Sequence, residues 1–198
     1  MKSITPHLAA LALSLFCSAP HAVAQTEKQS DAKPVKVVME TSKGAIELEL
    51  DSAKAPITVA NFVKYVKKGH YDGLIFHRVI PTFMIQGGGY TPELEQRPVD
   101  APIQIESKNG LKNKRGTIAM ARTGDPNSAT SQFFINVTDN DNLDYPSFDG
   151  FGYTVFGKVT KGIEVVDAIK DVETIQKMGR EKAFPVEPII IKSAKIAE

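Results

Sequence analysis

The sequence predicts a mainly β fold, a closed eight-stranded antiparallel barrel capped by two α-helices. Apolar residues alternate with a period of two in several short segments, and loops rich in Gly, Pro, Asn and Asp separate these segments. Only two stretches have the spacing of an amphipathic helix. A closed barrel exposes no sheet edge, so many short strands and few helices in one soluble domain favour it.

The first two expected strands form a hairpin. Val35, Val37 and Met39 share one face, a turn with Gly44 follows, and residues 46–50 alternate again. Loops bound further short apolar segments, and Pro188 suits the start of the last one. These segments complete the count of about eight strands: 74–80, 84–86, 116–121, 132–137, 153–158 and 189–191.

The first helix is expected between Pro56 and Gly69, because proline suits a first helical turn and glycine suits the position after the last. Between them an apolar stripe is formed by Val59, Phe62, Val63 and Val66. The second helix is expected over 163–169, where Ile163, Val166 and Ile169 are three residues apart.

The N-terminal residues predict export. Residues 1–24 contain Lys2, an apolar run and the ending Ala22-Val23-Ala24, which together form the pattern of a secretory signal peptide. Residues 25–33 are polar and are expected to be a disordered linker, so the folded domain is expected over 34–198. We therefore expect a periplasmic or secreted protein, cleaved near Ala24, with no stable membrane insertion.

Composition excludes several classes of function. Lys and Arg number 24 and Asp and Glu 23, a balance that argues against a nucleic-acid partner. The single cysteine, Cys17, lies in the signal segment, so neither a disulfide framework nor a cysteine-rich metal site is expected. The motifs of zinc proteases and serine hydrolases are absent, and 86–89 lacks the Lys-Ser/Thr of a phosphate-binding loop. We expect neither a metal nor another cofactor.

One segment, residues 76–88, stands out as a candidate site. On a strand Phe76, Arg78 and Ile80 share one face, which sets a guanidinium between apolar side chains. The same alternation pairs Met84 with Gln86 and Gln132 with Phe134. Together these residues form an apolar pocket rimmed by hydrogen-bonding groups, without a nucleophile. On the residues alone, core packing of the apolar members and a surface ion pair of Arg78 remain alternatives.

Four segments carry a resemblance to a known family: FHRVIPTFMIQGG (76–88), GTIAMAR (116–122), SQFFI (131–135) and YTVFGKV (153–159). They resemble the cyclophilins, a family of peptidyl-prolyl cis-trans isomerases, and the sequence is most similar to the bacterial periplasmic members. The resemblance covers nearly the whole chain after the linker, and the family's barrel with two helices agrees with the expected elements.

The resemblance implies a role for each matched residue. Arg78 matches the family's catalytic arginine, and Gln86 and Gln132 match groups that hold the peptide. Ala121 and Arg122 match the segment that borders the substrate backbone, and Tyr153 lies where other members carry a histidine at the pocket rim. The expected proline pocket consists of Phe83, Met84, Phe134 and Leu143.

The implied activity fits a site without a nucleophile, because rotation about an Xaa-Pro bond makes and breaks no covalent bond. The expected partners are proline-containing polypeptides, among them unfolded exported proteins, and we expect a monomer. Asn142 replaces a tryptophan of the better-known members, which predicts weak inhibition by cyclosporin. A peptide-binding or chaperone-like module without turnover is the main alternative, and a hydrolase is a more distant one. His77 is expected to be structural and His70 to lie on the surface.

Overall fold

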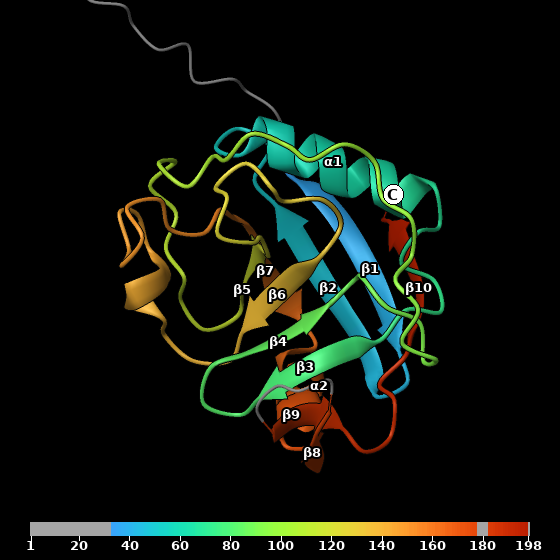
Figure 1. Cartoon of the computed structure of the whole chain (residues 1–198). Helices are drawn as coiled ribbons and strands as arrows, with labels where there is room; N and C mark the ends of the chain where they lie inside the picture. The colour runs from blue at the N-terminus through green and yellow to red at the C-terminus, as the bar shows by residue number, and fades with distance from the viewer. Residues whose placement is uncertain (1–32, 178–181, 198) are drawn as a thin grey trace, which may run out of the picture.

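The structure, a computed structural model, describes residues 33–177 and 182–197. It is built around one antiparallel sheet of eight strands that curls strongly into a half-barrel (Figure 1). The expected signal peptide at 1–24, and all but the last residue of the expected linker at 25–33, lie outside the described residues. The strand order across the sheet is β10-β1-β2-β7-β5-β6-β4-β3, and β8 and β9 form a separate two-stranded sheet.

In chain order the elements are β1 (Val35–Thr41), β2 (Gly44–Leu50), α1 (Pro56–Lys67), β3 (Phe76–Ile80), β4 (Met84–Gly87), β5 (Thr117–Met120), β6 (Phe133–Asn136), the short 3-10 helix η1 (Asp141–Leu143), β7 (Val155–Lys161), α2 (Ile163–Lys170), β8 (Thr174–Gln176), β9 (Lys182–Pro185) and β10 (Ile191–Ile196). None of the helices in the described ranges is long and apolar enough to cross a membrane.

The expectation of a closed barrel is wrong, because the sheet is open between its edge strands β10 and β3. An isolated bridge between Ile75 and Ile190 joins the residues that precede the two edge strands. An antiparallel bridge continues forward along one chain and backward along the other. From this bridge β3 and β10 therefore run away from each other, and they do not pair in the sheet.

Both predicted helices are present with nearly the predicted bounds. Helix α1 begins at Pro56 and is followed by Gly69, whose φ of +63° lets the chain turn back. Helix α2 covers Ile163–Lys170, and its buried side chains are Val166 and Ile169. Figure 1 shows α1 across one end of the sheet and α2 near the other, as the predicted caps require.

The strands agree with the predicted alternation wherever one face is buried. In the first hairpin Val37 lies opposite Leu48, and all four side chains of the pairs Val37–Leu48 and Met39–Ile46 are fully buried. The final strand begins at Ile191 and continues to Ile196, beyond the predicted 189–191, because β1 supplies a backbone partner for it. The pairing of β8 with β9 was not predicted, since three- and four-residue strands are too short to show a period.

The main core fills the inner face of the half-barrel. Phe62 of α1 packs against Phe133 of β6, with ring centroids 5.7 Å apart, and against Tyr71 at 5.0 Å. His70 was expected on the surface, but it is only 9% exposed because the turn after α1 returns it against Tyr65, at 4.5 Å between ring centroids. Burial lowers the pKa of the His70 imidazole.

A second, smaller apolar cluster lies on the opposite face of the same strands. Along β6, Phe133 joins the main core whereas its neighbour Phe134 joins this second cluster. The two faces of β6 are thus both buried, which a two-residue alternation alone does not reveal. The buried members of this outer cluster are Met84, Ala119, Phe134, Leu143 and Val155.

Candidate active site

The pairing of four strands sets the candidate side chains in one row on the outer face of the sheet. Arg78 of β3 lies opposite Gln86 of β4, Gln86 lies opposite Phe134 of β6, and Phe134 lies opposite Ala119 of β5. Directly opposite residues of antiparallel strands point to the same face. Segments distant in sequence thereby bring an arginine, a glutamine and a phenylalanine side by side.

All ten predicted site residues are brought together here. Gln132 is joined to this group through Gln86, which donates a hydrogen bond from Nε2 to Oε1 of Gln132 at 2.9 Å. The other nine line one cavity of about 120 Å³: Arg78, Phe83, Met84, Gln86, Ala121, Arg122, Phe134, Leu143 and Tyr153. Their roles at the site stay predictions and are taken up below as proposals.

Arg78 is half-buried on the wall of this cavity. Its Nη1 lies 3.9 Å from the sulfur of Met84, and its Cζ lies 5.8 Å from the ring centroid of Phe83. A guanidinium stays charged at every physiological pH and has five N–H donors. The apolar neighbours therefore set a permanent cation at the edge of an apolar pocket.

Buried apolar side chains form the part of the cavity wall that lies against the sheet. Met84 is 1% exposed, and Phe134 and Leu143 are each 4% exposed. Tyr153 meets Phe134 edge-to-face, with ring centroids 5.8 Å apart. A small ring entering the cavity would lose water on several sides and contact only apolar atoms there.

Glycines allow the polar rim to approach the strand. A Cβ built on Gly89 would lie 2.7 Å from the side chain of Gln132, which is closer than real contacts allow. Gly88 has φ +84°, and its carbonyl accepts a hydrogen bond from Oγ of Ser131 at 2.8 Å. The glycine run after Gln86 is therefore a close backbone approach that fixes Gln132, not a phosphate-binding loop.

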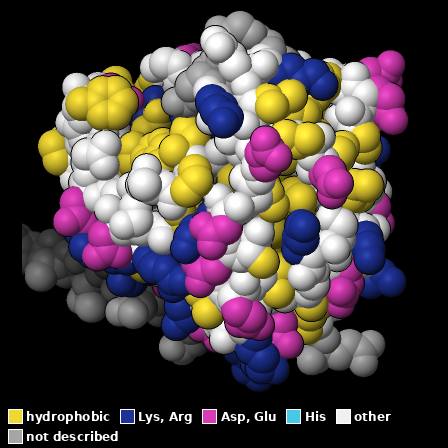
Figure 2. All heavy atoms as spheres, turned by 90° about the horizontal axis from the view of Figure 1, so that it is seen from below, with side chains coloured by type: hydrophobic (Ala, Val, Ile, Leu, Met, Phe, Trp, Pro, Cys, Tyr) yellow, Lys and Arg dark blue, Asp and Glu magenta, His cyan; other side chains and the backbone are white. Residues whose placement is uncertain are grey.

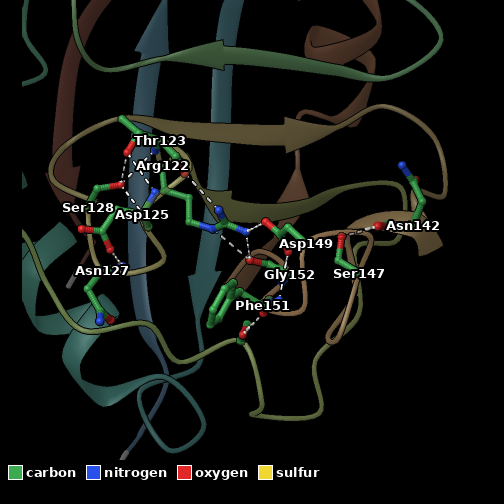
Figure 3. A network of polar contacts seen from close by, with 11 residues as sticks. Arg122, Thr123, Asp125, Asn127, Ser128, Asn142, Ser147, Asp149, Phe151 and Gly152 are labelled. Carbon is green, nitrogen blue, oxygen red and sulfur yellow. Dashed lines mark hydrogen bonds and ion pairs between the residues drawn. The ribbon is translucent and has the colours of Figure 1, made fainter.

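Arg122 lines the cavity, but its Nε and Nη2 donors are directed to the loop between η1 and β7 (Figure 3), while Nη1 donates to the carbonyl of Thr123 at 3.0 Å. Its side chain is 3% exposed, its Nη2 forms an ion pair with Asp149, and Nε and Nη2 donate to the carbonyl of Gly152 at 3.0 and 2.7 Å. The Cζ of Arg122 lies 4.3 Å from the ring centroid of Tyr153. The Arg122 guanidinium holds the pKa of Asp149 at about 2. Arg122 therefore fixes this loop against the pocket.

Sequence reasoning missed a buried asparagine network beneath the pocket. Asn140 donates from Nδ2 to the carbonyl of Phe83 at 2.8 Å and to Oδ1 of Asn136 at 2.7 Å. Asn136 donates in turn to Oδ1 of Asn113 at 3.2 Å, and Asn113 donates from Nδ2 to Asp144 at 3.0 Å. The network ties both ends of η1 to the sheet and so positions Leu143.

One signal in the sequence could have found this network. Asn136 is two residues from Phe134 and so lies on the same strand face, yet it is fully buried. A buried amide needs hydrogen-bond partners, and nearby asparagines are candidates.

Comparison with known proteins agrees with this geometry. Residues 36–196 match the family model described as cyclophilin type peptidyl-prolyl cis-trans isomerase. The chain is 58% identical over 162 residues to peptidyl-prolyl cis-trans isomerase cyp18 of Streptomyces antibioticus, covering 81% of this chain and 97% of that protein. It is 49% identical over 164 residues to peptidyl-prolyl cis-trans isomerase B of Escherichia coli, covering 82% and 99%.

Solved structures give the same answer. The crystal structure of a cyclophilin-type isomerase of Cryptosporidium parvum in the presence of the dipeptide Ala-Pro aligns with a TM-score of 0.68 at 27% identity. The alignment covers 82% of this chain and 99% of that one. The chain, whose outer sheet face carries an arginine beside an apolar pocket, belongs to the family of cyclophilin-type peptidyl-prolyl cis-trans isomerases.

Proposed function

We propose that this isomerase acts on proline-containing segments of exported proteins and assists their folding, with Arg78 as its catalytic residue. The observation that carries the proposal is the position of Arg78 on the wall of an apolar cavity that is sized for a small ring. Gln86 lines the same cavity and donates a hydrogen bond to Gln132, so the two amides lie where they can hold the peptide backbone.

Rotation about an Xaa-Pro bond requires that amide resonance be lost, at a barrier of about 20 kcal/mol. In the twisted state the prolyl nitrogen regains a lone pair and becomes a hydrogen-bond acceptor. Arg78 donates to this nitrogen, an interaction that either planar form lacks. Such a differential interaction lowers the barrier, because only bonds stronger in the transition state than in the ground state accelerate the step.

The arginine accounts for only part of the acceleration. Shortening the uncatalysed time from about 100 s to about 10 ms is four decades, or about 5.5 kcal/mol. A hydrogen bond from a charged donor contributes about 1.5–3 kcal/mol. The remainder comes from Phe83, Met84, Phe134 and Leu143, which hold the ring, while Gln86 and Gln132 fix the backbone so that rotation is confined to one bond.

The N-terminal sequence supports an extracytoplasmic site of action. Residues 1–24 have the pattern of a signal peptide, and Cys17 is the only cysteine in the chain. Cleavage near Ala24 would leave a thiol-free protein, which suits an oxidising compartment. N-terminal sequencing of the protein from a periplasmic fraction should begin at Gln25. Recovery of uncleaved chain from the cytoplasm alone would contradict this part of the proposal.

The isomerase activity and the role of Arg78 are tested by a protease-coupled Xaa-Pro assay on the wild type and Arg78→Ala. The wild type should turn over the cis peptide rapidly and Arg78→Ala should be slower by about 10- to 150-fold, the loss of one charge-assisted hydrogen bond. Equal, slow rates for both proteins would favour a binding module without turnover. Cleavage of the peptide without the coupling protease would favour a hydrolase.

A further inference from the structure

The loop that follows the pocket carries an unusual concentration of exposed aromatic side chains. Tyr145 is 40% exposed, Phe148 76% and Phe151 44%, and in the described ranges no other aromatic side chain is among the exposed large hydrophobic residues. In Figure 2 hydrophobic side chains gather at the side of the molecule where Figure 1 places this loop. Exposed apolar clusters of this kind mark interaction surfaces. We call these three residues the aromatic ridge.

Hydrogen bonds between side chains and the loop backbone hold the ridge in its exposed position. Oδ1 of Asp149 accepts hydrogen bonds from the backbone N–H groups of Phe151 and Gly152 at 2.9 and 3.0 Å (Figure 3). Ser147 donates from Oγ to the carbonyl of Asn142 at 2.6 Å, and Ser107 donates to the carbonyl of Phe151. A ridge that is already ordered loses little conformational entropy when a partner binds to it.

The ridge is continuous with the isomerase pocket. Leu143 and Tyr153, which flank the loop, both line the pocket, and Asp149 within the loop is paired with the pocket residue Arg122. A polypeptide whose proline occupies the pocket therefore passes close to residues on the same short loop. The position of the ridge beside the pocket therefore favours binding of the side chains that flank this proline in the bound polypeptide.

The charges beside the ridge favour an apolar occupant. A hollow of about 630 Å³ adjoins the ridge, and its walls combine Tyr145 and Phe148 with lysines and aspartates. These charges are paired with one another: Lys114 lies 2.7 Å from Asp141, and Lys112 lies 3.5 Å from Asp144. Paired charges of both signs give the hollow no strong attraction for an anionic or cationic ligand.

We propose that the aromatic ridge binds apolar side chains of the same polypeptide whose proline occupies the pocket, so that the enzyme selects prolines within hydrophobic segments. Such segments are exposed in unfolded chains and buried in folded ones. The proposal rests on the proposed function, because it takes the substrate to be a polypeptide bound at the Arg78 pocket. It adds a second contact that a very short peptide does not reach.

The test compares two labelled peptides with the same central Ala-Pro. One has leucines at positions two to six residues from the proline on both sides, and the other has serines there, since an extended chain advances about 3.3 Å per residue. Fluorescence anisotropy measures the Kd of each peptide for the purified wild type, Phe148→Ser and Phe148→Leu. The matched control is Val186→Ser, because Val186 is also apolar, is 47% exposed and lies outside this loop.

The wild type should bind the leucine peptide at least about fivefold more tightly than the serine peptide, as burial of part of an aromatic ring implies. The ratio should fall at least about threefold in Phe148→Ser, and should be retained in Val186→Ser and largely restored in Phe148→Leu. Equal ratios in the wild type and Phe148→Ser would overturn the proposal. So would sedimentation of the wild type as a dimer that Phe148→Ser dissociates, because a second copy would then occupy the ridge.

The binding ratio is independent of turnover, so the two proposals can fail separately. Equal turnover of a short Ala-Pro tetrapeptide by the wild type and Arg78→Ala would contradict the proposed catalytic role of Arg78 and leave the ratio interpretable. Normal turnover with no leucine preference would contradict only the role of the ridge.

Discussion

Asp149 accepts an ion-paired hydrogen bond from Arg122, and this contact joins the loop between η1 and β7 to the wall of the isomerase pocket. The side chain of Asp149 is 22% exposed and that of Arg122 only 3%. A nearly buried guanidinium whose partner is removed keeps the cost of its desolvation. The pair therefore holds the loop in place more strongly than an ordinary surface ion pair does.

The Arg122–Asp149 pair predicts a specific pH dependence of stability. Asp149→Asn should lower the free energy of unfolding at pH 7 by about 1.5–3 kcal/mol, the worth of a charge-assisted hydrogen bond. The Arg122 hydrogen bond lowers the pKa of Asp149 from 3.8 to about 2. A lowered pKa stabilises the folded state above the unfolded pKa, and this stabilisation is lost as the pH falls through the folded pKa.

The difference between the wild type and Asp149→Asn should therefore shrink between about pH 4 and pH 2, as urea unfolding at several pH values would measure. Asp100 also has a pKa of about 2, caused by Lys64 and Lys68, but it is present in both proteins and cancels in the difference. A difference that stays constant down to pH 2 would contradict the assigned cause.

The buried asparagine network predicts an effect on stability and activity together. Asn140→Ala removes the donor that satisfies Oδ1 of the fully buried Asn136, at a cost of about 1–3 kcal/mol. It also removes one of the two hydrogen bonds that the carbonyl of Phe83 accepts, the other being from the N–H of Val137 at 3.2 Å, so turnover of a short peptide should fall. Asn142→Ala is the control, since its exposed side chain should contribute less than about 0.5 kcal/mol. Equal unfolding midpoints for the two variants would show that the network does not position the pocket.

Gly162 and Gly110 have nearly the same φ, so alanine substitutions at these two positions distinguish the cost of a steric clash from the cost of backbone strain. Gly162 has φ +82°, and a Cβ there would lie 2.1 Å from the carbonyl oxygen of Ala45; Gly110 has φ +80° and nothing within 4 Å. Both alanine variants bear the cost of a left-handed residue, about 1–2 kcal/mol. Gly162→Ala should lose at least about 1–3 kcal/mol more, the cost of overpacking. Denaturant unfolding checks this, and equal losses would refute the close approach of α2 to β2.

Cyclosporin should inhibit the enzyme weakly. The resemblance to the cyclophilins matches Asn142 with a tryptophan of better-known members, and the Asn142 side chain lines the hollow beside Phe148 and not the isomerase pocket. An inhibition titration of the wild type and Asn142→Trp should show stronger inhibition of the variant. Submicromolar inhibition of the wild type would contradict the prediction.

The parts of the fold that were predicted are those that depend on local patterns. Alternation placed Phe134 and Gln86 on the face that they occupy, and the Pro56 and Gly69 signals bounded α1. The choice of the ten candidate site residues followed from the resemblance to the cyclophilins, whose matched segments contain most of them, and their roles stay predictions. Neither the local patterns nor the resemblance depends on whether the two edge strands of the sheet pair with each other.

What was not predicted depends on contacts between distant segments. Whether β3 and β10 pair is decided by the curvature of the whole sheet, and no local pattern reports it. The bond between Asn136 and Asn113 spans 23 residues, and the burial of His70 depends on how the chain packs beneath α1. The β8–β9 hairpin is too short for its period to be recognised.

The central claim is that the Arg78 guanidinium stabilises the twisted amide more than it stabilises the bound planar peptide. The most direct test is Arg78→Ala, which removes the guanidinium together with its charge and its N–H donors. Exchange NMR on a bound Ala-Pro peptide gives the isomerisation rate, and titration gives the Kd. The account predicts a rate reduced about 10- to 150-fold with the Kd unchanged within about twofold. A rate within about twofold of the wild type, or a loss carried entirely by the Kd, would contradict it.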